Sequence, residues 1–175
     1  MKIKNRKFFE RSAAEVAKDL LGKIIVRNVN GKVLRARILE VEAYFDESDP
    51  ASWARLGKRK DNFVMWEKPG LVLVKNVHKY FMLNFVVNSV GVAGAVLIRG
   101  VRPLNFEARV NGPGLLSLAL EVNKDLNGED AVISDKIWIE DDGFVVSDED
   151  VFRSKRIGVV GDLEGEYRYW VKNMD

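Results

Sequence analysis

Cysteine is absent from this chain of 175 residues, and histidine occurs only at position 78. Without cysteine there is no disulfide, thiolate metal site, iron–sulfur cluster or cysteine nucleophile. One histidine gives little basis for a zinc site, and the acidic clusters at 140–142 and 148–150 lack the alternating ligands and central glycine of a calcium loop. We therefore expect neither a metal nor another cofactor.

Long apolar runs are also missing. No stretch approaches the roughly 20 apolar residues that cross a bilayer, and the basic start at 1–8 leads into Glu10 and Arg11 rather than a signal-peptide core. We expect an intracellular protein that does not span a membrane. Glycine-rich phosphate loops and a G-x-S-x-G elbow are absent too, which disfavours nucleotide enzymes and serine hydrolases.

The composition that remains is that of a globular protein, with 47% hydrophobic and 31% charged residues. No linker, repeat or low-complexity tract interrupts the chain, so we predict one domain over residues 1–175. Nothing in the sequence calls for an obligate protein partner, and we expect a monomer.

The net charge of +2 conceals a division along the chain. Residues 1–120 hold 21 Lys and Arg against 11 Asp and Glu, whereas residues 121–175 hold 7 against 15. One basic face that contacts a phosphate backbone would explain this division, and so would the charge-rich surface of a heat-adapted protein. The candidate phosphate contacts are Arg55, Lys58, Arg59, Lys60, Lys75 and Lys79.

Strands dominate the predicted secondary structure. A capping box at Ser12 and Glu15 predicts a helix up to Gly22, and a second short helix starts at 113 or 114. Strand-like runs follow one another without long helices between them, at 23–27, 32–44, 71–74, 80–87, 95–99, 136–139, 156–160 and 167–171. This order predicts an α/β (α+β) fold: a curved mixed or antiparallel sheet, or partly open barrel, with a few short peripheral helices. The polar tip at 75–79 would be a projecting hairpin.

Alternation along the run 32–44 places Glu42 and Tyr44 on one side, together with Leu34, Ala36 and Ile38. A carboxyl at the end of an apolar face is partly desolvated, which makes it a plausible proton acceptor. A solvated glutamate at a strand end is the alternative interpretation.

Two other strands each carry one polar residue on an apolar face, Asn84 and Arg99. Buried polar groups need partners, so Glu42 with Arg99 could be a purely structural ion pair, and Asn84 could satisfy nearby backbone. His78 lies among polar residues at the predicted hairpin tip, a position that argues against catalysis.

An ordered series of segments resembles one known family, the alkyladenine (3-methyladenine) DNA glycosylases. The likeness covers most of the chain. Its segments are EVAKDLLGK at 15–23, RILEVEAY at 37–44, DPAS at 49–52, KPG at 68–70, YFMLN at 80–84, AVLIR at 95–99, NGPG at 111–114, RIGV at 156–159 and YRYWVKN at 167–173.

The resemblance implies a protein that binds duplex DNA containing damaged purines, flips an alkylated or deaminated purine into a pocket and hydrolyses its N-glycosidic bond. On that basis Glu42 activates the attacking water and Arg99 helps to orient it. Tyr44 stacks on the flipped base, and Asn84 disfavours the amino group of guanine. The implied enzyme is monofunctional, because water rather than a lysine attacks the sugar.

Departures from the family fall in the implied base pocket. Trp53 stands where the family has histidine, and residues 72–78 replace a tyrosine-rich strand and hairpin. The expected pocket is therefore Tyr44, Trp53, Val74 and Asn84, and the expected wedge into DNA is Asn76, Val77 and His78. Lost stacking predicts weaker flipping or an altered lesion preference.

Two alternatives remain open from the sequence. One is a catalytically weak or inactive relative that binds damaged DNA without excising a base, which the missing tyrosines favour. The other is an RNA-binding or RNA-modifying domain on a similar curved sheet. Retention of both Glu42 and Arg99 favours the enzyme over the first alternative.

Overall fold

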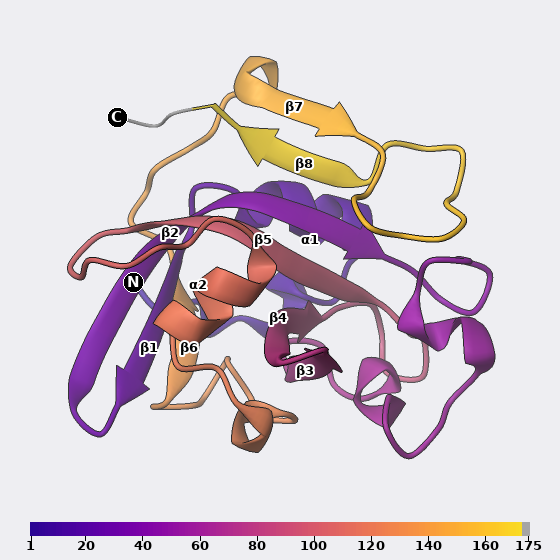
Figure 1. Cartoon of the computed structure of the whole chain (residues 1–175), viewed down its shortest axis with the longest axis horizontal. Coiled ribbons are helices and arrows are strands. Elements are labelled where there is room, and N and C mark those ends of the chain that lie inside the picture. The colour runs from indigo at the N-terminus through magenta and orange to yellow at the C-terminus, as the bar shows by residue number, and fades with distance from the viewer. Residues whose placement is uncertain (173–175) are drawn as a thin grey trace.

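The computed structural model describes residues 1–172 (Figure 1). Residues 173–175, and with them Asn173 of the C-terminal segment quoted above, lie outside the described residues. The helices are α1 (Ala13–Leu20) and α2 (Pro113–Ala119). The strands are β1 (Ile24–Val29), β2 (Lys32–Tyr44), β3 (Val72–Val77), β4 (Tyr80–Val86), β5 (Ala95–Pro103), β6 (Ile137–Glu140), β7 (Val151–Ser154) and β8 (Arg168–Val171).

These strands form one curled antiparallel sheet in the order β3-β4-β5-β2-β1-β6, with β8 joined to β2 and β7 joined to β8. The α+β class and the curved sheet are confirmed. The organising strand is β2, which is 13 residues long and pairs with β5 along one edge through residues 36–44. Its other edge is shared, because residues 32–37 pair with β1 and residues 40–42 pair with β8.

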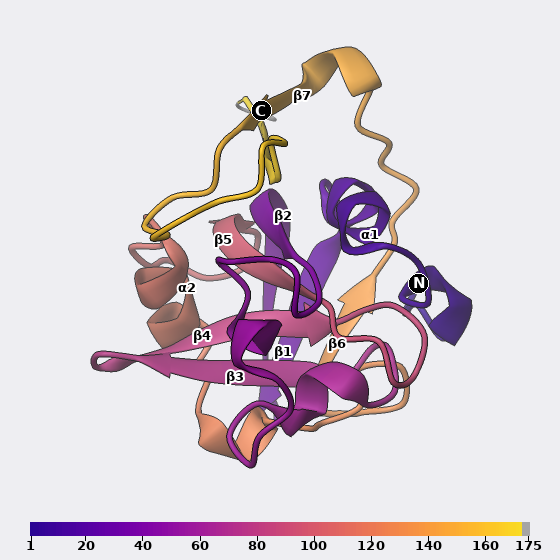
Figure 2. The ribbon, with the colours of Figure 1, turned by 90° about the vertical axis from the view of Figure 1, so that its right-hand side faces the viewer.

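Helix α1 packs against β2 and β5, and α2 packs against β4 and β5. In the two views the helices lie on opposite sides of these strands (Figures 1 and 2). The predicted capping box of α1 is present, since Ser12 accepts from the Glu15 N–H while the Glu15 carboxylate accepts from the Ser12 N–H. Val16, Ala17 and Leu20 are fully buried in the core. No helix within residues 1–172 is long and apolar enough to cross a membrane.

Alternation along β2 breaks once, and this corrects the grouping predicted from sequence. Leu34, Ala36 and Ile38 face the core, but so do Val41 and Ala43, three and five residues beyond Ile38. The pairing register with β5 shifts on either side of Glu40, so the strand contains a bulge there. Glu42 and Tyr44 therefore lie on the side opposite Leu34, Ala36 and Ile38.

The bulge requires close approach between β2 and β5. Gly100 pairs with Glu40, and a Cβ on Gly100 would lie 3.0 Å from the Glu40 Cβ. A side chain at position 100 would therefore push the two strands apart where their register changes. Glycine at this position lets the irregular pairing close.

Two other expectations change with the structure. Residues 156–160 were expected as a strand, but they form a loop between β7 and β8, and the pairing segment is β7 at 151–154. The predicted tip at 75–79 is shorter than expected, because β3 extends to Val77 and pairs with Tyr80, which leaves a two-residue turn at His78 and Lys79. The hairpin of β3 and β4 projects from the body of the protein (Figure 2).

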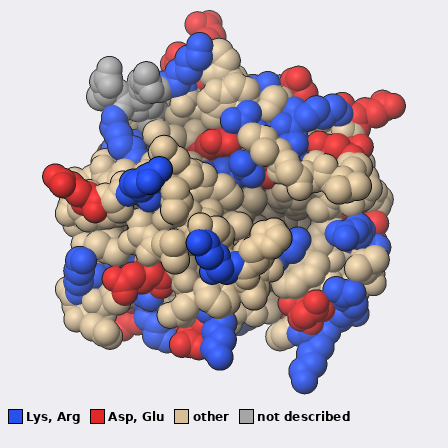
Figure 3. Space-filling view, in the orientation of Figure 1, with Lys and Arg blue, Asp and Glu red and all other residues tan. Residues whose placement is uncertain are grey.

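In the fold, acidic residues from the second part of the chain form ion pairs with basic residues from the first part. The acidic residues that follow β6 pair with basic residues of the first half: Glu140 with Arg35, Asp141 with Lys23 and Asp142 with Arg37, at 2.7–2.9 Å. Lys and Arg lie among acidic side chains rather than in one continuous stripe on the face shown in Figure 3. These three ion pairs neutralise part of the basic excess of residues 1–120 within the fold.

Candidate active site

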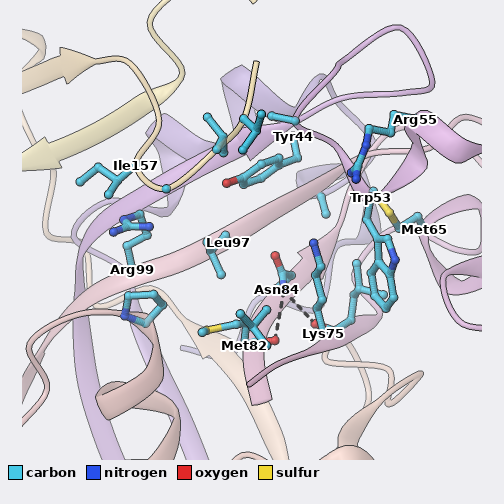
Figure 4. A pocket seen from close by; sticks show the side chains of 18 of the residues that line it. Tyr44, Trp53, Arg55, Met65, Lys75, Met82, Asn84, Leu97, Arg99 and Ile157 are labelled. Carbon is cyan, nitrogen blue, oxygen red and sulfur yellow. Dashed lines mark hydrogen bonds between the residues drawn. The ribbon is translucent and has the colours of Figure 1, made fainter. Parts of the chain in front are cut away.

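A cavity of about 340 Å³ opens on the side of the sheet where Glu42 lies. That size is within the range of small-molecule sites. Its walls come from β2, β3, β4 and β5, from the short helix η2 (Trp53–Leu56), from the start of α2 and from the loop 157–160 (Figure 4). Segments more than 100 residues apart in sequence therefore converge on one space.

Glu42 lies immediately behind this wall and is 0% exposed. One carboxylate oxygen accepts a 2.7 Å hydrogen bond from the Tyr44 hydroxyl. The other accepts a 2.7 Å bond from the Ile157 N–H and lies 3.4 Å from Nη1 of Arg99. Tyr44, Arg99 and Ile157 all line the cavity, so each partner of this carboxylate is also a cavity residue.

Arg99 is held from behind by a second carboxylate. Glu40 accepts 3.0 Å and 2.6 Å bonds from Nε of Arg99 and Nε of Arg168. The Nε contact fixes the plane of the Arg99 guanidinium and leaves its Nη1 directed at Glu42. Glu40 and Arg168 were not among the predicted site residues, because their contact with Arg99 depends on the pairing of β2 with β8.

Tyr44 is clamped between the acid and a buried cation. The Arg156 guanidinium lies 4.6 Å from the Tyr44 ring centroid, and burial, followed by the charge of Glu42 and the hydrogen bond to it, raises the pKa of the Tyr44 hydroxyl. Arg156 and Asp49 both have fully buried side chains and make two bonds of 2.6 and 2.7 Å, with Asp162 as a further acceptor. Burial lowers the pKa of Arg156, but its bonds to Asp49 and Asp162 raise it overall. This arrangement fixes the residue next to Ile157.

Trp53 and Lys75 form the opposite wall. The Lys75 ammonium lies 5.3 Å from the Trp53 ring centroid, and both residues line the cavity. Burial, with a smaller contribution from Arg55, lowers the pKa of Lys75 from its usual 10.5. Lys75 was expected on the DNA backbone; the structure places it in the cavity, because it shares a face of β3 with Leu73 and Val77.

Asn84 is buried and lines the same cavity. Its side-chain nitrogen donates to the backbone oxygens of Leu73 at 3.2 Å and Met82 at 3.1 Å. These bonds fix the orientation of the amide, so its oxygen is directed at the cavity (Figure 4). Among residues 1–172, no donor is bonded to that oxygen. Both interpretations made for Asn84 are compatible with these contacts.

The hairpin residues divide between the two faces of β3. Val77 lines the cavity, while Asn76 and His78 are exposed. His78 adopts a left-handed φ of 53° in the turn. Val74 does not line the cavity, which corrects the expectation for this residue: it packs into the core, and its neighbours Leu73 and Lys75 face the cavity instead.

The expected phosphate contacts lie on two exposed segments. One segment is η2 and the residues after it, with the exposed side chains Arg55, Lys58, Arg59 and Lys60; of these four, Arg55 lies at the cavity rim. The other is the hairpin turn, where Lys79 is exposed. Lys58 pairs with Glu67 at 3.1 Å and Arg59 pairs with Asp61 at 3.0 Å. These two cations are therefore partly neutralised in the free protein. No three His, Asp or Glu residues within 1–172 are grouped as ligands for a metal ion.

The structure thus brings a buried carboxylate, an arginine, aromatic rings and an amide together around one cavity of a curled antiparallel sheet. The family profile of methylpurine-DNA glycosylase matches residues 7–175. The chain belongs to this family, which makes it a hydrolase of the DNA glycosylase class that functions in DNA repair.

Individual relatives agree with the family over nearly their whole length. A protein of Clostridium perfringens (strain 13) named "Putative 3-methyladenine DNA glycosylase" is 36% identical, with 96% of this chain and 95% of that protein aligned. A protein of the same name from Aeropyrum pernix is also 36% identical, over 95% of this chain and 88% of its own length. One from Clostridium botulinum (strain Loch Maree) is 32% identical, over 96% and 95%.

Proposed function

We propose that this protein excises a damaged purine from duplex DNA by flipping it into the cavity and hydrolysing its N-glycosidic bond with a water activated by Glu42. The substrates are alkylated purines such as the 3-methyladenine in the relatives' name, and deaminated purines such as hypoxanthine. One observation carries the proposal: a fully buried carboxylate whose three contacts, Tyr44, Arg99 and Ile157, all line the cavity.

The chemical step uses the Arg99 side of the carboxylate. The 3.4 Å separation from Arg99 to Glu42 is longer than a tight charge-assisted bond, so this oxygen can still accept from an incoming water. The oxygen of the water bonds to C1′ of the sugar, and Glu42 accepts the proton that this water loses. The bond from C1′ to the purine nitrogen breaks, and its electron pair leaves with the base.

Charge develops on the sugar during this step. A carboxylate next to C1′ stabilises the positive charge in the transition state, and it is most effective where water is excluded. Glu42 meets this condition, because it is buried and its hydrogen bonds hold it in one orientation before any substrate arrives. The rigid support comes from Glu40, which holds Arg99, and from Arg156, which is held by Asp49 and Asp162 beside Ile157.

The flipped base would enter between the Tyr44 and Trp53 sides of the cavity, with Asn84 at its edge. Val77, at the end of β3, is the apolar side chain closest to the hairpin turn on the cavity side and would fill the space left in the duplex. The exposed lysines and arginines of 55–60 and Lys79 would contact phosphates. No partner protein is required for this arrangement, and the proposed active form is a monomer.

Single-turnover release of bases from damaged duplexes tests the proposal. Glu42→Gln keeps the size of the side chain but removes the proton acceptor, so release should fall by about 10²- to 10⁴-fold. Glu107→Gln is the matched control, since Glu107 is exposed and does not line the cavity. It should release bases at the wild-type rate. Absence of release by the wild type, with duplex affinity retained, would identify a damage-binding relative instead.

The identity of the nucleophile can be tested separately. Borohydride reduces a Schiff base between a lysine and the sugar to a stable adduct, and Lys75 is the lysine in the cavity to consider. Water as the nucleophile predicts no protein–DNA adduct in wild type. An adduct that disappears in Lys75→Met would contradict the monofunctional mechanism.

A further inference from the structure

The charged residues that line the cavity are all cationic: Arg55, Lys75 and Arg99. No Asp or Glu side chain of residues 1–172 lines it, and Glu42 lies behind the wall. Arg99 is neutralised by Glu40 and Glu42, whereas Lys75 makes no salt bridge with a carboxylate of the described chain. A lone ammonium therefore faces the space that receives the base.

Both aromatic rings of the cavity already have a cation near one face. Lys75 lies over Trp53 at 5.3 Å, and Arg156 lies against Tyr44 at 4.6 Å. The attraction between a ring and a cation depends on the negative charge of the ring face. A second cation gains less from a ring that already interacts with a first, so this pocket offers little cation–π stabilisation to a charged base.

Damaged purines differ in charge. Methylation at N3 or N7 of a purine in DNA leaves the base cationic, whereas deamination of adenine gives hypoxanthine, which is neutral. A cationic base placed near Lys75 meets like-charge repulsion in a partly desolvated cavity, where such repulsion is much less screened than in water. The charge of the lining thus disfavours N-methylated purines.

The polar groups of the cavity also fit one edge of hypoxanthine. Lys75 supplies a donor, and the free side-chain oxygen of Asn84 supplies an acceptor. The two side chains project from neighbouring strands into the same space below Tyr44 (Figure 4). Hypoxanthine presents C6=O beside N1–H, which is an acceptor beside a donor.

We propose that Lys75, together with Asn84, makes this cavity selective for uncharged deaminated purines of the hypoxanthine type over cationic N-methylated purines. The inference rests on the proposed function, since it names the preferred substrate class of the same site. Lys75 acts here as a specificity-determining residue, and Glu42 and Arg99 retain the chemical step.

The test compares two damaged duplexes of one sequence, one with hypoxanthine and one with 7-methylguanine on a 2′-fluoro sugar that resists hydrolysis. Equilibrium affinity for both is measured, along with single-turnover release of hypoxanthine and release of methylpurines from DNA treated with dimethyl sulfate. The proteins are wild type, Lys75→Met, Lys75→Arg and Lys79→Met. Pairing costs that differ between the duplexes cancel when each preference is compared across proteins.

Lys75→Met should raise binding and release of methylpurines relative to hypoxanthine by about tenfold or more, since it removes one unit charge at short range. Lys75→Arg keeps the charge and should keep the wild-type preference. Lys79→Met removes a charge from the exposed turn of the same hairpin, so it should lower the affinity for both duplexes by the same factor.

The outcomes separate the two proposals. An unchanged preference in Lys75→Met overturns the role of Lys75 even if every base is released normally. A wild type that releases nothing, but whose binding preference still shifts in Lys75→Met, overturns the glycosylase function and keeps the charge selection. Equal binding of both lesions by wild type and by Lys75→Met overturns the selectivity, whatever is released.

Discussion

The two walls of the cavity are built in different ways. The wall proposed for catalysis, called the catalytic wall below, consists of Tyr44, Arg99 and Ile157 with Glu42 directly behind them, and each of these residues is joined to another of the four by a hydrogen bond or ion pair. The receiving wall consists of Trp53, Lys75, Val77 and Asn84. In that wall Lys75 contacts a ring rather than a carboxylate, Val77 sits at the end of a projecting hairpin, and only Asn84 is tied to backbone.

This difference separates chemistry from selection. Stabilisation of a transition state depends on groups that are oriented before the substrate arrives, and the catalytic wall supplies them. Recognition of a lesion depends on side chains that meet the base, and in the proposed function the receiving wall supplies them. The departures that the sequence resemblance implies, at Trp53 and along residues 72–78, include the receiving-wall residues Trp53, Lys75 and Val77.

The largest effect should follow from breaking the support of the catalytic wall with Arg156→Met. This change leaves Asp49 buried without its partner, so the free energy of unfolding should fall by about 3–5 kcal/mol. Arg55→Met, at the rim of the receiving wall, should change it by less than about 0.5 kcal/mol. Urea denaturation of both variants measures the contrast, and similar losses in the two would abolish the distinction between the walls.

A smaller effect is expected for Trp53→Ala in the receiving wall. Loss of stacking should weaken affinity for a lesion-containing duplex by about 1–3 kcal/mol, with Trp53→Phe retaining most of the affinity. Titration of labelled duplex gives the affinity, and single-turnover release at saturating protein gives the rate. A rate that falls as steeply as the affinity would place Trp53 functionally in the catalytic wall.

A smaller effect again is expected for Glu40→Gln. This change tests the support behind Arg99 and alters no residue that lines the cavity. The amide cannot hold two guanidinium groups as the carboxylate does, so release should slow by about tenfold, or about 1.4 kcal/mol. Affinity for the damaged duplex should stay unchanged, because the receiving wall is intact. Weaker binding with an unchanged rate would contradict a positioning role for Glu40.

The mildest perturbation is a change of pH. Burial acts to raise the pKa of Asp49, but bonds from Arg156 and from the N–H groups of Phe45 and Ala51 outweigh it, so the pKa lies below 3.8. Because the folded pKa is depressed, the stabilisation is present above pH 3.8 and is lost as pH falls through the folded value. Wild type should therefore lose stability more steeply in acid than Asp49→Asn. Parallel acid-unfolding curves for the two proteins would contradict this linkage.

Much of the catalytic wall was predictable. Strand alternation pairs Glu42 with Tyr44 and marks Asn84 and Arg99 as the single polar residues on otherwise apolar strand faces, and the family resemblance supplies their implied roles. The bulge at Glu40 was not predictable, because neither glycine nor proline stands at position 39 or 40 to indicate a break in the strand. The correct pairing of Glu42 with Tyr44 was thus reached with the wrong assignment of faces.

The receiving wall was harder to predict because its geometry depends on one turn. Two-residue hairpin turns favour glycine and asparagine, and here the left-handed position is taken by His78. The sequence therefore predicts a longer polar tip at 75–79. That prediction places Lys75 outside the strand and makes Val74 the expected pocket residue of this segment. Once the turn is placed at His78 and Lys79, the period of two along β3 assigns Leu73, Lys75 and Val77 to the cavity.

The bulge in β2 also has a consequence for how the chain reaches its native state. A regular pairing without the bulge would carry Glu40 and Glu42 into the hydrophobic interior and turn Val41 and Ala43 toward the cavity. Burying unpaired carboxylates in that way costs several kcal/mol for each charge, so the misaligned sheet is strongly disfavoured during folding. The acid proposed for the chemical step thereby also selects the correct alignment of the longest strand in the protein.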